Sequence, residues 1–323
     1  MQAALLGLDI GGTKSAALVG DTDGNVIARQ QWPSNAQRGP DPMLDELTDH
    51  AHQLLREHPT VERVGVAIGG PVDCDAGVVY SPPNLPGWNA IDLRQRLAAA
   101  LGLPVSVEHD AAACAMAEAR WGIGRELGDA PTLIYLTCGT GFGAGLVLRG
   151  KPWHGSGGRS PEVGHVRLAA DGPVAFGKRG SAEAFCAGSS LPRIAAWRFP
   201  SRWANSPPDG PQLKQLWDGG DDDAAAVIAL NASMTARVCA MLADLLIPDA
   251  IALGSLAQHL GERWVEQVRR AFEAEVLPDV AARCRIGAAQ LGDRLQDLST
   301  LAAAMRSPMG KVNTERAERH GSW

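Results

Sequence analysis

The run Asp9-Ile-Gly-Gly-Thr-Lys14 joins two apolar stretches near the start of the chain. The stretch before it extends from Ala3 to Leu8, and the stretch after it extends from Ser15 to Val19. Two strand-like runs joined by a glycine turn are typical of a β-hairpin. Glycine in such a turn lets the backbone approach a ligand closely and point several N–H groups at one anion. The alternative is an ordinary hairpin turn that binds nothing.

The same order of features returns in the middle of the chain. An apolar run from Thr132 to Thr137 leads into the turn Gly139-Thr-Gly-Phe-Gly143, and a second apolar run extends from Ala144 to Leu148. The repeat is loose in sequence but alike in pattern, which favours an internal duplication and two related domains facing each other. Two matching glycine turns indicate a phosphate site more specifically than either turn alone. Neither turn has the Gly-Lys-Thr order of a Walker A loop or the spacing of a Rossmann fingerprint.

The rest of the chain alternates strand-like and helical patterns. Short apolar runs at 64–68, 105–107 and 251–253 predict buried strands, and apolar residues recur at helical spacing over 41–55 and 225–246. Segment 199–222 is rich in Pro, Gly and Asp, so we expect a surface excursion there. The alternation predicts an α/β fold with largely buried sheets, in which ligands bind at the carboxyl ends of strands.

Composition narrows the classes of protein. A hydrophobic content of 45% with 20% charged residues permits a sizeable core and excludes disorder throughout the chain. Basic residues number 30 and acidic residues 36, so the net charge of −6 favours neither nucleic acid nor anionic lipid as a partner. No run of about 18 uninterrupted apolar residues occurs, so we expect no membrane span. The six cysteines form no CxxC pair, and we expect reduced cytoplasmic thiols rather than disulfides or a zinc cage.

Two aspartates that follow predicted strands are candidates for chemistry. Asp9 ends the first strand beside the glycine turn, where a carboxylate would repel bare phosphate but could hold Mg²⁺ through water. Asp110 precedes an Ala-rich helix at about 110–120, and a carboxylate there could accept a proton in phosphoryl transfer. The structural alternatives are a turn cap for Asp9 and a helix N-cap for Asp110, and the second can coexist with catalysis.

Five motifs occur in the order seen in the ROK family of bacterial sugar kinases and sugar-responsive repressors. They are Asp9-Ile-Gly-Gly-Thr-Lys14, Asn84-Leu-Pro-Gly-Trp88, Asp110-Ala-Ala, Gly139-Thr-Gly-Phe-Gly-Ala-Gly145 and Glu162-Val-Gly-His165. The chain resembles that family over about residues 3–305. The resemblance implies the actin-like ATPase (ribonuclease H-like) fold, with two α/β domains around a cleft. We expect domains at 1–108, completed by a C-terminal helix at about 293–306, and at 109–292, followed by a flexible tail at 307–323.

The resemblance also assigns roles to residues. Asp110 matches the family's general base, which takes the proton from the sugar hydroxyl as that hydroxyl attacks the γ-phosphate. The positions that match ATP- and phosphate-binding residues are Asp9, Gly11, Gly12, Thr13, Lys14, Gly139, Thr140, Gly141, Gly143 and Gly254, and Asp9 would hold Mg²⁺ through water. The positions that match sugar-binding residues are Gly70, Asn84, His109, Asp110, Glu162, His165 and Glu183.

The chain departs from the family pattern after His165. Many members carry three zinc-binding cysteines there, but the matching positions hold Val174, Phe176 and Ser181. None of these is a good zinc ligand, and one His cannot hold structural zinc alone. We therefore expect no structural zinc, with the apolar Val174 and Phe176 packing the loop instead.

Two further departures lie beside the general base. His109 and Ala112 stand where the family commonly has Asn. Imidazole is bulkier than an amide and can carry charge, so the change at 109 affects the choice of sugar more than the type of reaction. Trp88 could stack on a sugar face or pack in the core.

The resemblance implies an ATP-dependent kinase that phosphorylates a hexose hydroxyl, as the family's glucokinases do. It implies ATP and Mg²⁺ as cofactors, a small-molecule sugar as substrate and a cytoplasmic homodimer. The alternatives are an N-acetylhexosamine kinase, a non-catalytic sugar sensor, and an actin-fold ATPase with a non-sugar substrate. Because the first glycine turn begins at Asp9, the N-terminal DNA-binding domain of family repressors does not fit, and we expect no nucleic-acid or membrane partner.

Overall fold

A computed structural model describes residues 3–306 of the chain. The first five-stranded sheet has the order β3-β2-β1-β4-β8. β1 pairs with β2 antiparallel and with β4 parallel, so the sequence-predicted hairpin is present. The bounds of these strands are Ala4–Ile10 for β1, Lys14–Asp21 for β2, Val26–Pro33 for β3, Val61–Ile68 for β4 and Val105–His109 for β8.

The second five-stranded sheet repeats this arrangement, with the order β11-β10-β9-β14-β15. Its central strand β9 pairs with β10 antiparallel and with β14 parallel, as β1 does with its neighbours. The bounds are Leu133–Leu136 for β9, Ala144–Leu148 for β10, Lys151–Pro152 for β11, Ala250–Leu253 for β14 and Arg285–Ala288 for β15. The shared topology agrees with the internal duplication inferred from the two glycine turns.

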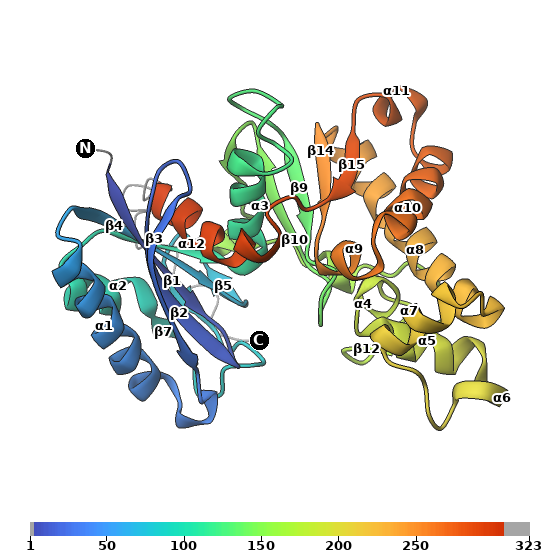
Figure 1. Cartoon of the computed structure of the whole chain (residues 1–323), viewed down its shortest axis with the longest axis horizontal. Helices are drawn as coiled ribbons and strands as arrows, with labels where there is room; N and C mark the ends of the chain where they lie inside the picture. The colour runs from blue at the N-terminus through green and yellow to red at the C-terminus, as the bar shows by residue number, and fades with distance from the viewer. Residues whose placement is uncertain (1–2, 307–323) are drawn as a thin grey trace.

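Two helices fill the space between the sheets (Figure 1). α12 (Leu295–Met305) packs on the first sheet, α3 (Asp110–Trp121) packs on the second, and the two helices pack on each other. Successive residues of a strand point to opposite faces, so Leu5 and Tyr135 contribute to this shared core while Leu6 and Ile134 face the outer helices. The junction therefore ties the two lobes together through one apolar layer.

Strand glycines permit the close approach of these helices. A Cβ atom on Gly65 of β4 would lie 2.1 Å from the backbone nitrogen of Ala304 in α12. A Cβ atom on Gly145 of β10 would lie 1.9 Å from the carbonyl oxygen of Ala111 in α3. Each central helix thus sits on its own sheet where only glycine leaves room for the backbone.

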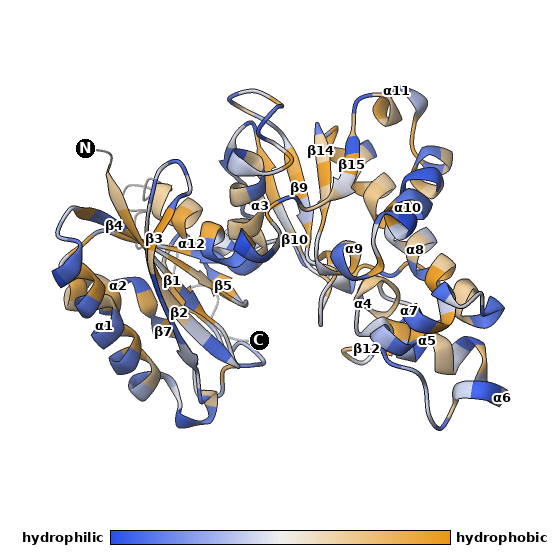
Figure 2. Cartoon of the chain, viewed as in Figure 1, coloured by the Kyte–Doolittle hydropathy of each residue, from blue (hydrophilic) through white to orange (hydrophobic). Residues whose placement is uncertain are grey.

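The outer helices cover the remaining faces of the sheets. α1 (Pro40–Glu57) and α2 (Leu93–Leu101) cover the first sheet; α1 begins at Pro40 with Gly39 before it, one residue before the start expected at Asp41. α8 (Asp222–Leu246) and α10 (Glu262–Glu275) pack on each other over the second sheet. Orange strands at the centre of each lobe in Figure 2 reflect these apolar layers.

α8 is long and apolar enough to cross a membrane by length and composition alone. Of its most apolar 18-residue window, 61% is buried inside the protein. Its side chains pack against α10, α4 (Ala182–Cys186) and α5 (Ser190–Arg198), so it is built as a core helix of the second lobe.

The surface segment expected at 199–222 is largely helical. This segment contains α6 (Pro200–Trp203) and α7 (Gly210–Asp218), and it buries Trp203, Leu213 and Trp217. Asp209 and Gln212 cap α7 reciprocally, so the Pro, Gly and Asp residues act as helix-start signals rather than loop formers.

The remaining elements are short. They are η1 (Ala36–Arg38), β5 (Val72–Asp73), β6 (Val78–Val79), β7 (Ile91–Asp92), η2 (Ser156–Gly158), η3 (Val163–His165), β12 (Val174–Ala175), β13 (Lys178–Arg179), α9 (Ser255–Leu260), α11 (Pro278–Ala281) and η4 (Gly292–Arg294). The tail expected at 307–323 lies outside the described residues.

Gly65→Ala should destabilise the protein by about 3 kcal/mol, because the added methyl group must displace backbone rather than a flexible side chain. Urea denaturation measures the change. The matched control is Gly287→Ala in β15, where the new Cβ would meet only the Cδ1 atom of Ile123 at 3.4 Å. That variant should stay within about 1 kcal/mol of the parent. Equal losses in both variants would contradict the close-approach argument.

Candidate active site

The first glycine turn lies between β1 and β2 and contacts the predicted sugar loop. Asp9 is the next-to-last residue of β1, and Lys14 is the first residue of β2, with Gly11, Gly12 and Thr13 between the strands. A Cβ atom on Gly12 would lie 2.6 Å from the carbonyl oxygen of Asn84. The turn and the loop that carries Asn84 are therefore in direct contact, and Gly12 is required for that contact.

The Asp9 carboxyl group occupies an unusual electrostatic environment. Burial, and then the negative charge of Asp110, together raise its pKa to about 7, against the opposing charge of Lys14. The side chain is half-buried near the end of a central strand. Because the charge of Asp110 disfavours a second negative charge on Asp9, a cation is favoured at this position.

The second glycine turn is ordered by hydrogen bonds from its own backbone. The Gly143 N–H donates to Thr137 Oγ1 at 3.0 Å, and the Gly139 N–H donates to the Gly141 carbonyl at 3.0 Å. The Ser189 hydroxyl donates to the Thr140 carbonyl at 2.5 Å. The turn is thus fixed to the segment before α5, which the sequence did not indicate.

Glu183 and Gly254, predicted for different ligands, both lie against this second turn. The Glu183 carboxylate accepts the Phe142 N–H at 3.2 Å. A Cβ atom on Gly254 would lie 2.4 Å from the Thr137 carbonyl oxygen, just before α9 begins. A Cβ atom on Gly164 would lie 2.3 Å from the Phe142 carbonyl oxygen, so the Glu162-Val-Gly-His165 motif also packs on the turn.

Asp110 is the first residue of α3, and its side chain is 47% exposed. His109, rather than Asp110, is the N-cap: its Nδ1 accepts the Ala111 N–H at 3.2 Å, so the N-cap alternative is wrong by one residue. A Cβ atom on Gly70 would lie 2.8 Å from the His109 ring. The same Ala111 N–H also donates to Asp110 Oδ1 at 2.6 Å, so the half-exposed carboxylate is held at the start of the helix.

The segment after His165 is held by groups other than the expected ones. Val174 is 44% exposed and Phe176 is 68% exposed, so the expectation that they pack the loop is wrong. Ser181 is buried and caps α4, accepting the Ala184 N–H at 3.2 Å. Lys178 donates to the His165 carbonyl, and the rings of His165 and Phe176 lie 5.9 Å apart.

Two other residues that the sequence analysis singled out, Glu162 and Trp88, lie at opposite extremes of exposure. Glu162 is 65% exposed and lies 3.7 Å from Arg159. Trp88 is fully buried, so it packs in the core and is not a stacking surface. Sequence reasoning missed the ordering groups Ser189 and Lys178, because each acts through a contact with another segment of the chain. It also missed Thr137, whose hydroxyl accepts the Gly143 N–H within the turn itself.

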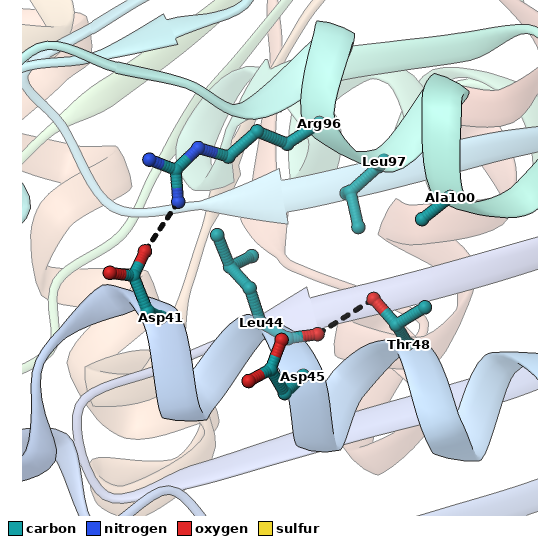
Figure 3. A pocket seen from close by; sticks show the side chains of 7 residues that line it. All are labelled: Asp41, Leu44, Asp45, Thr48, Arg96, Leu97 and Ala100. Carbon is teal, nitrogen blue, oxygen red and sulfur yellow. Dashed lines mark hydrogen bonds and ion pairs between the residues drawn. The ribbon is translucent and has the colours of Figure 1, made fainter.

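Two pockets of the described residues lie away from these side chains. One, of about 140 Å³, lies between α1 and α2, where Arg96 and Asp41 form an ion pair at 2.5 Å (Figure 3). The other, of about 380 Å³, lies beside the edge strand β15. Neither is lined by a sequence-predicted site residue.

The two repeated sheets, with a glycine turn after the first strand of each, define the actin-like ATPase fold, which confirms the sequence-based expectation. A family model described as "ROK family" matches residues 5–302, and the chain belongs to that family. A glucokinase of Streptomyces coelicolor is 30% identical over 83% of this chain and 86% of its own length.

Two solved structures are similar over most of their length. The ROK hexokinase of Thermus thermophilus is 30% identical, with a TM-score of 0.79, over 93% of this chain and 97% of its own. A ROK family glucokinase of Streptomyces griseus, in complex with glucose and AMPPNP, is 28% identical, with a TM-score of 0.73, over 93% of this chain and 98% of its own.

Asp9→Asn should change how stability depends on pH. Because burial raises the pKa of Asp9 from 3.8 to about 7, the folded protein keeps a proton that the unfolded chain releases across that interval. The parent therefore loses stability as the pH rises from about 4 to 7, and the Asn variant lacks this loss. Thermal unfolding should show the variant melting about 2–4 °C above the parent at pH 8 and level with it at pH 4. A constant difference at all pH values would contradict the assignment.

Proposed function

We propose that this ATP-dependent sugar kinase transfers the γ-phosphoryl group of ATP to a hydroxyl of a hexose, with Asp110 as general base. The observation that carries the proposal is the electrostatic proximity of Asp110 and Asp9 at the end of β1 and the start of α3. Glucokinase relatives at about 28–30% identity over most of the chain support a hexose as substrate.

The proposed reaction uses a small set of side chains and backbone groups. The Asp110 carboxylate accepts the hydroxyl proton while the sugar oxygen forms a bond to the γ-phosphorus and the bond from that phosphorus to the bridging oxygen of ADP breaks. The N–H groups of Gly11, Gly12 and Gly141 are proposed to hold the phosphates, and Lys14 adds positive charge. Gly139 shapes the second turn by donating its N–H to the Gly141 carbonyl. Asn84, Glu162, His165 and Glu183 are proposed to bind sugar hydroxyls, with Gly70 and His109 beside them.

The acidic residues fit Mg²⁺. Burial and the nearby charge of Asp110 both disfavour the Asp9 carboxylate, a divalent ion beside it would favour that charged form, and carboxylate oxygen is a preferred Mg²⁺ ligand. When bound, the ion would neutralise charge on the phosphates. Asp9 would hold it through water, as the resemblance implies.

We also propose the organisation of the chain. α12 packs on the first sheet, which supports a first domain of 1–108 completed by the helix near 293–306 and a second domain of 109–292. The proposal includes a cytoplasmic homodimer, and six buried free cysteines suit a reducing compartment. Sedimentation equilibrium would test the dimer.

A substrate panel tests the function. Purified protein with Mg-ATP should release ADP in a sugar-dependent way with hexoses and not with N-acetylhexosamines. A preference for N-acetylhexosamines would favour the alternative within the same class. Sugar binding by calorimetry without any turnover would instead favour a non-catalytic sensor.

Asp110→Asn should lower kcat by about 10²- to 10⁴-fold while sugar binding changes little, since the amide cannot accept the proton. ADP release and calorimetry measure the two effects. The control is Asp222→Asn, which changes the first residue of another helix and should keep the parent kcat. Turnover by Asp110→Asn at the parent rate would reject the general-base role.

We propose that the loop after His165 holds its shape without zinc. The supporting contact is the hydrogen bond that the Lys178 ammonium group donates to the His165 carbonyl. This positively charged side chain holds the backbone of the loop at His165. Lys178→Met should raise the KM for the sugar severalfold, while Lys214→Met, which breaks an exposed ion pair in α7, should not. Metal analysis should find no zinc, and one zinc per chain would overturn this proposal.

A further inference from the structure

A buried carboxylate lies two residues before the proposed base. Glu108, in β8, has no exposed surface. His154 Nε2 lies 2.9 Å from its Oε2, and the Arg306 guanidinium donates to its Oε1 at 2.5 Å. An unpaired carboxylate in such a place would be strongly destabilising, so both partners are structurally required.

The His154 partner comes from the other lobe. His154 follows β11 of the second sheet, and the segment after it runs to Glu162 and His165, the proposed sugar ligands. This segment also docks on the first lobe: the Cys74 N–H donates to the Gly158 carbonyl at 3.0 Å. Gly158 has a φ of +63°, and a Cβ atom on it would lie 2.3 Å from Asp73 Oδ1, so only glycine fits the contact.

Arg306 closes the cluster from the end of α12. It also binds Asp75 Oδ1 at 2.6 Å and the Cys74 carbonyl at 3.1 Å, and the Ser106 hydroxyl donates to its carbonyl at 3.0 Å. Burial opposes the charge of this guanidinium, but Glu108 and Asp75 outweigh burial and raise the pKa of Arg306. The carboxylate of Glu108 is therefore neutralised within the protein.

Metal binding is the other use such a cluster could have. The ligand atoms of Cys74, Glu108 and His154 lie within 4.8 Å of one another. Both oxygens of Glu108 already bind nitrogen atoms, and burial followed by the charge of Glu108 raises the pKa of the Cys74 thiol, which disfavours the thiolate a metal needs. The arrangement is complete as a hydrogen-bonded network.

We infer that the buried Glu108–His154 contact fixes the sugar-binding segment relative to Asp110, with Arg306 neutralising Glu108. Both residues are positioning residues: neither touches the reacting atoms, but one is joined by backbone to the base and the other to the sugar motif. The contact thus connects the proposed base, Asp110, to the segment that carries Glu162 and His165, which are proposed to bind the same sugar. This inference rests on the proposed function of Asp110.

The test compares His154→Phe, which keeps a ring but has no donor, with His154→Gln, which keeps a nitrogen donor. The Phe variant should lower kcat/KM for the sugar by about 10- to 100-fold, because a hydrogen bond to a buried charge is lost. The KM for ATP should stay within about twofold of the parent, because the glycine turns are untouched. The Gln variant should recover sugar kinetics to within about threefold of the parent.

The matched control is Glu118→Gln. Glu118 is equally buried, lies in α3, and accepts three backbone N–H groups from Ile123, Gln290 and Leu291. The Glu118→Gln variant should lower the melting temperature, but it should not change the KM for the sugar more than the KM for ATP. If His154→Phe does not fold, His154→Ala is measured in its place.

Several outcomes would overturn the inference. The inference is wrong if His154→Phe changes the KM for the sugar and the KM for ATP equally, or if His154→Gln is as impaired as His154→Phe. It is also wrong if Glu118→Gln changes the KM for the sugar without changing the KM for ATP. With an active parent and an inactive Asp110→Asn, these outcomes leave the proposed function standing. A parent that phosphorylates no sugar would overturn both proposals.

Discussion

The backbone contact between each sheet and its central helix is the constraint on which the rest of the structure depends. Gly65 lets α12 rest on the first sheet, and Gly145 lets α3 rest on the second. Because α3 and α12 also pack on each other, the two sheets are held on either side of one shared apolar layer. That layer brings Asp110, at the start of α3, toward Asp9, near the end of β1.

Three carboxylates, those of Asp9, Glu108 and Asp110, lie where the two lobes meet, and their surroundings differ. Glu108 is sealed from solvent and neutralised by Arg306, while its neighbour Asp110 remains half-exposed. Asp9 lies between these extremes, and burial raises its pKa to about 7. The three carboxylates thus differ in exposure and in partners, which agrees with the separate roles proposed for them.

Sequence patterns located the elements that depend on local order. The strands around both glycine turns and the long helix at 222–246 are visible as apolar periodicity, and the five motifs give the family. Sequence patterns were insufficient where contacts with residues far apart in the chain determine the local structure. Segment 199–222 was expected as a surface excursion, yet it contains two helices, and its Trp203 and Trp217 side chains are buried in the core of the second lobe. Val174 and Phe176 were expected to pack the loop, yet both side chains are exposed.

Local sequence order was enough to predict the two hairpins, the repeated topology and the candidate site residues, because turns, periodicity and motif order are properties of neighbours in the chain. Only the tertiary structure decided that His109 caps α3, that Glu183 joins the second glycine turn, and that His154 reaches Glu108. Those contacts join residues that lie far apart in the chain or depend on a side chain's exact direction. No local pattern encodes them, because the energy of each depends on burial that the folded lobes create together.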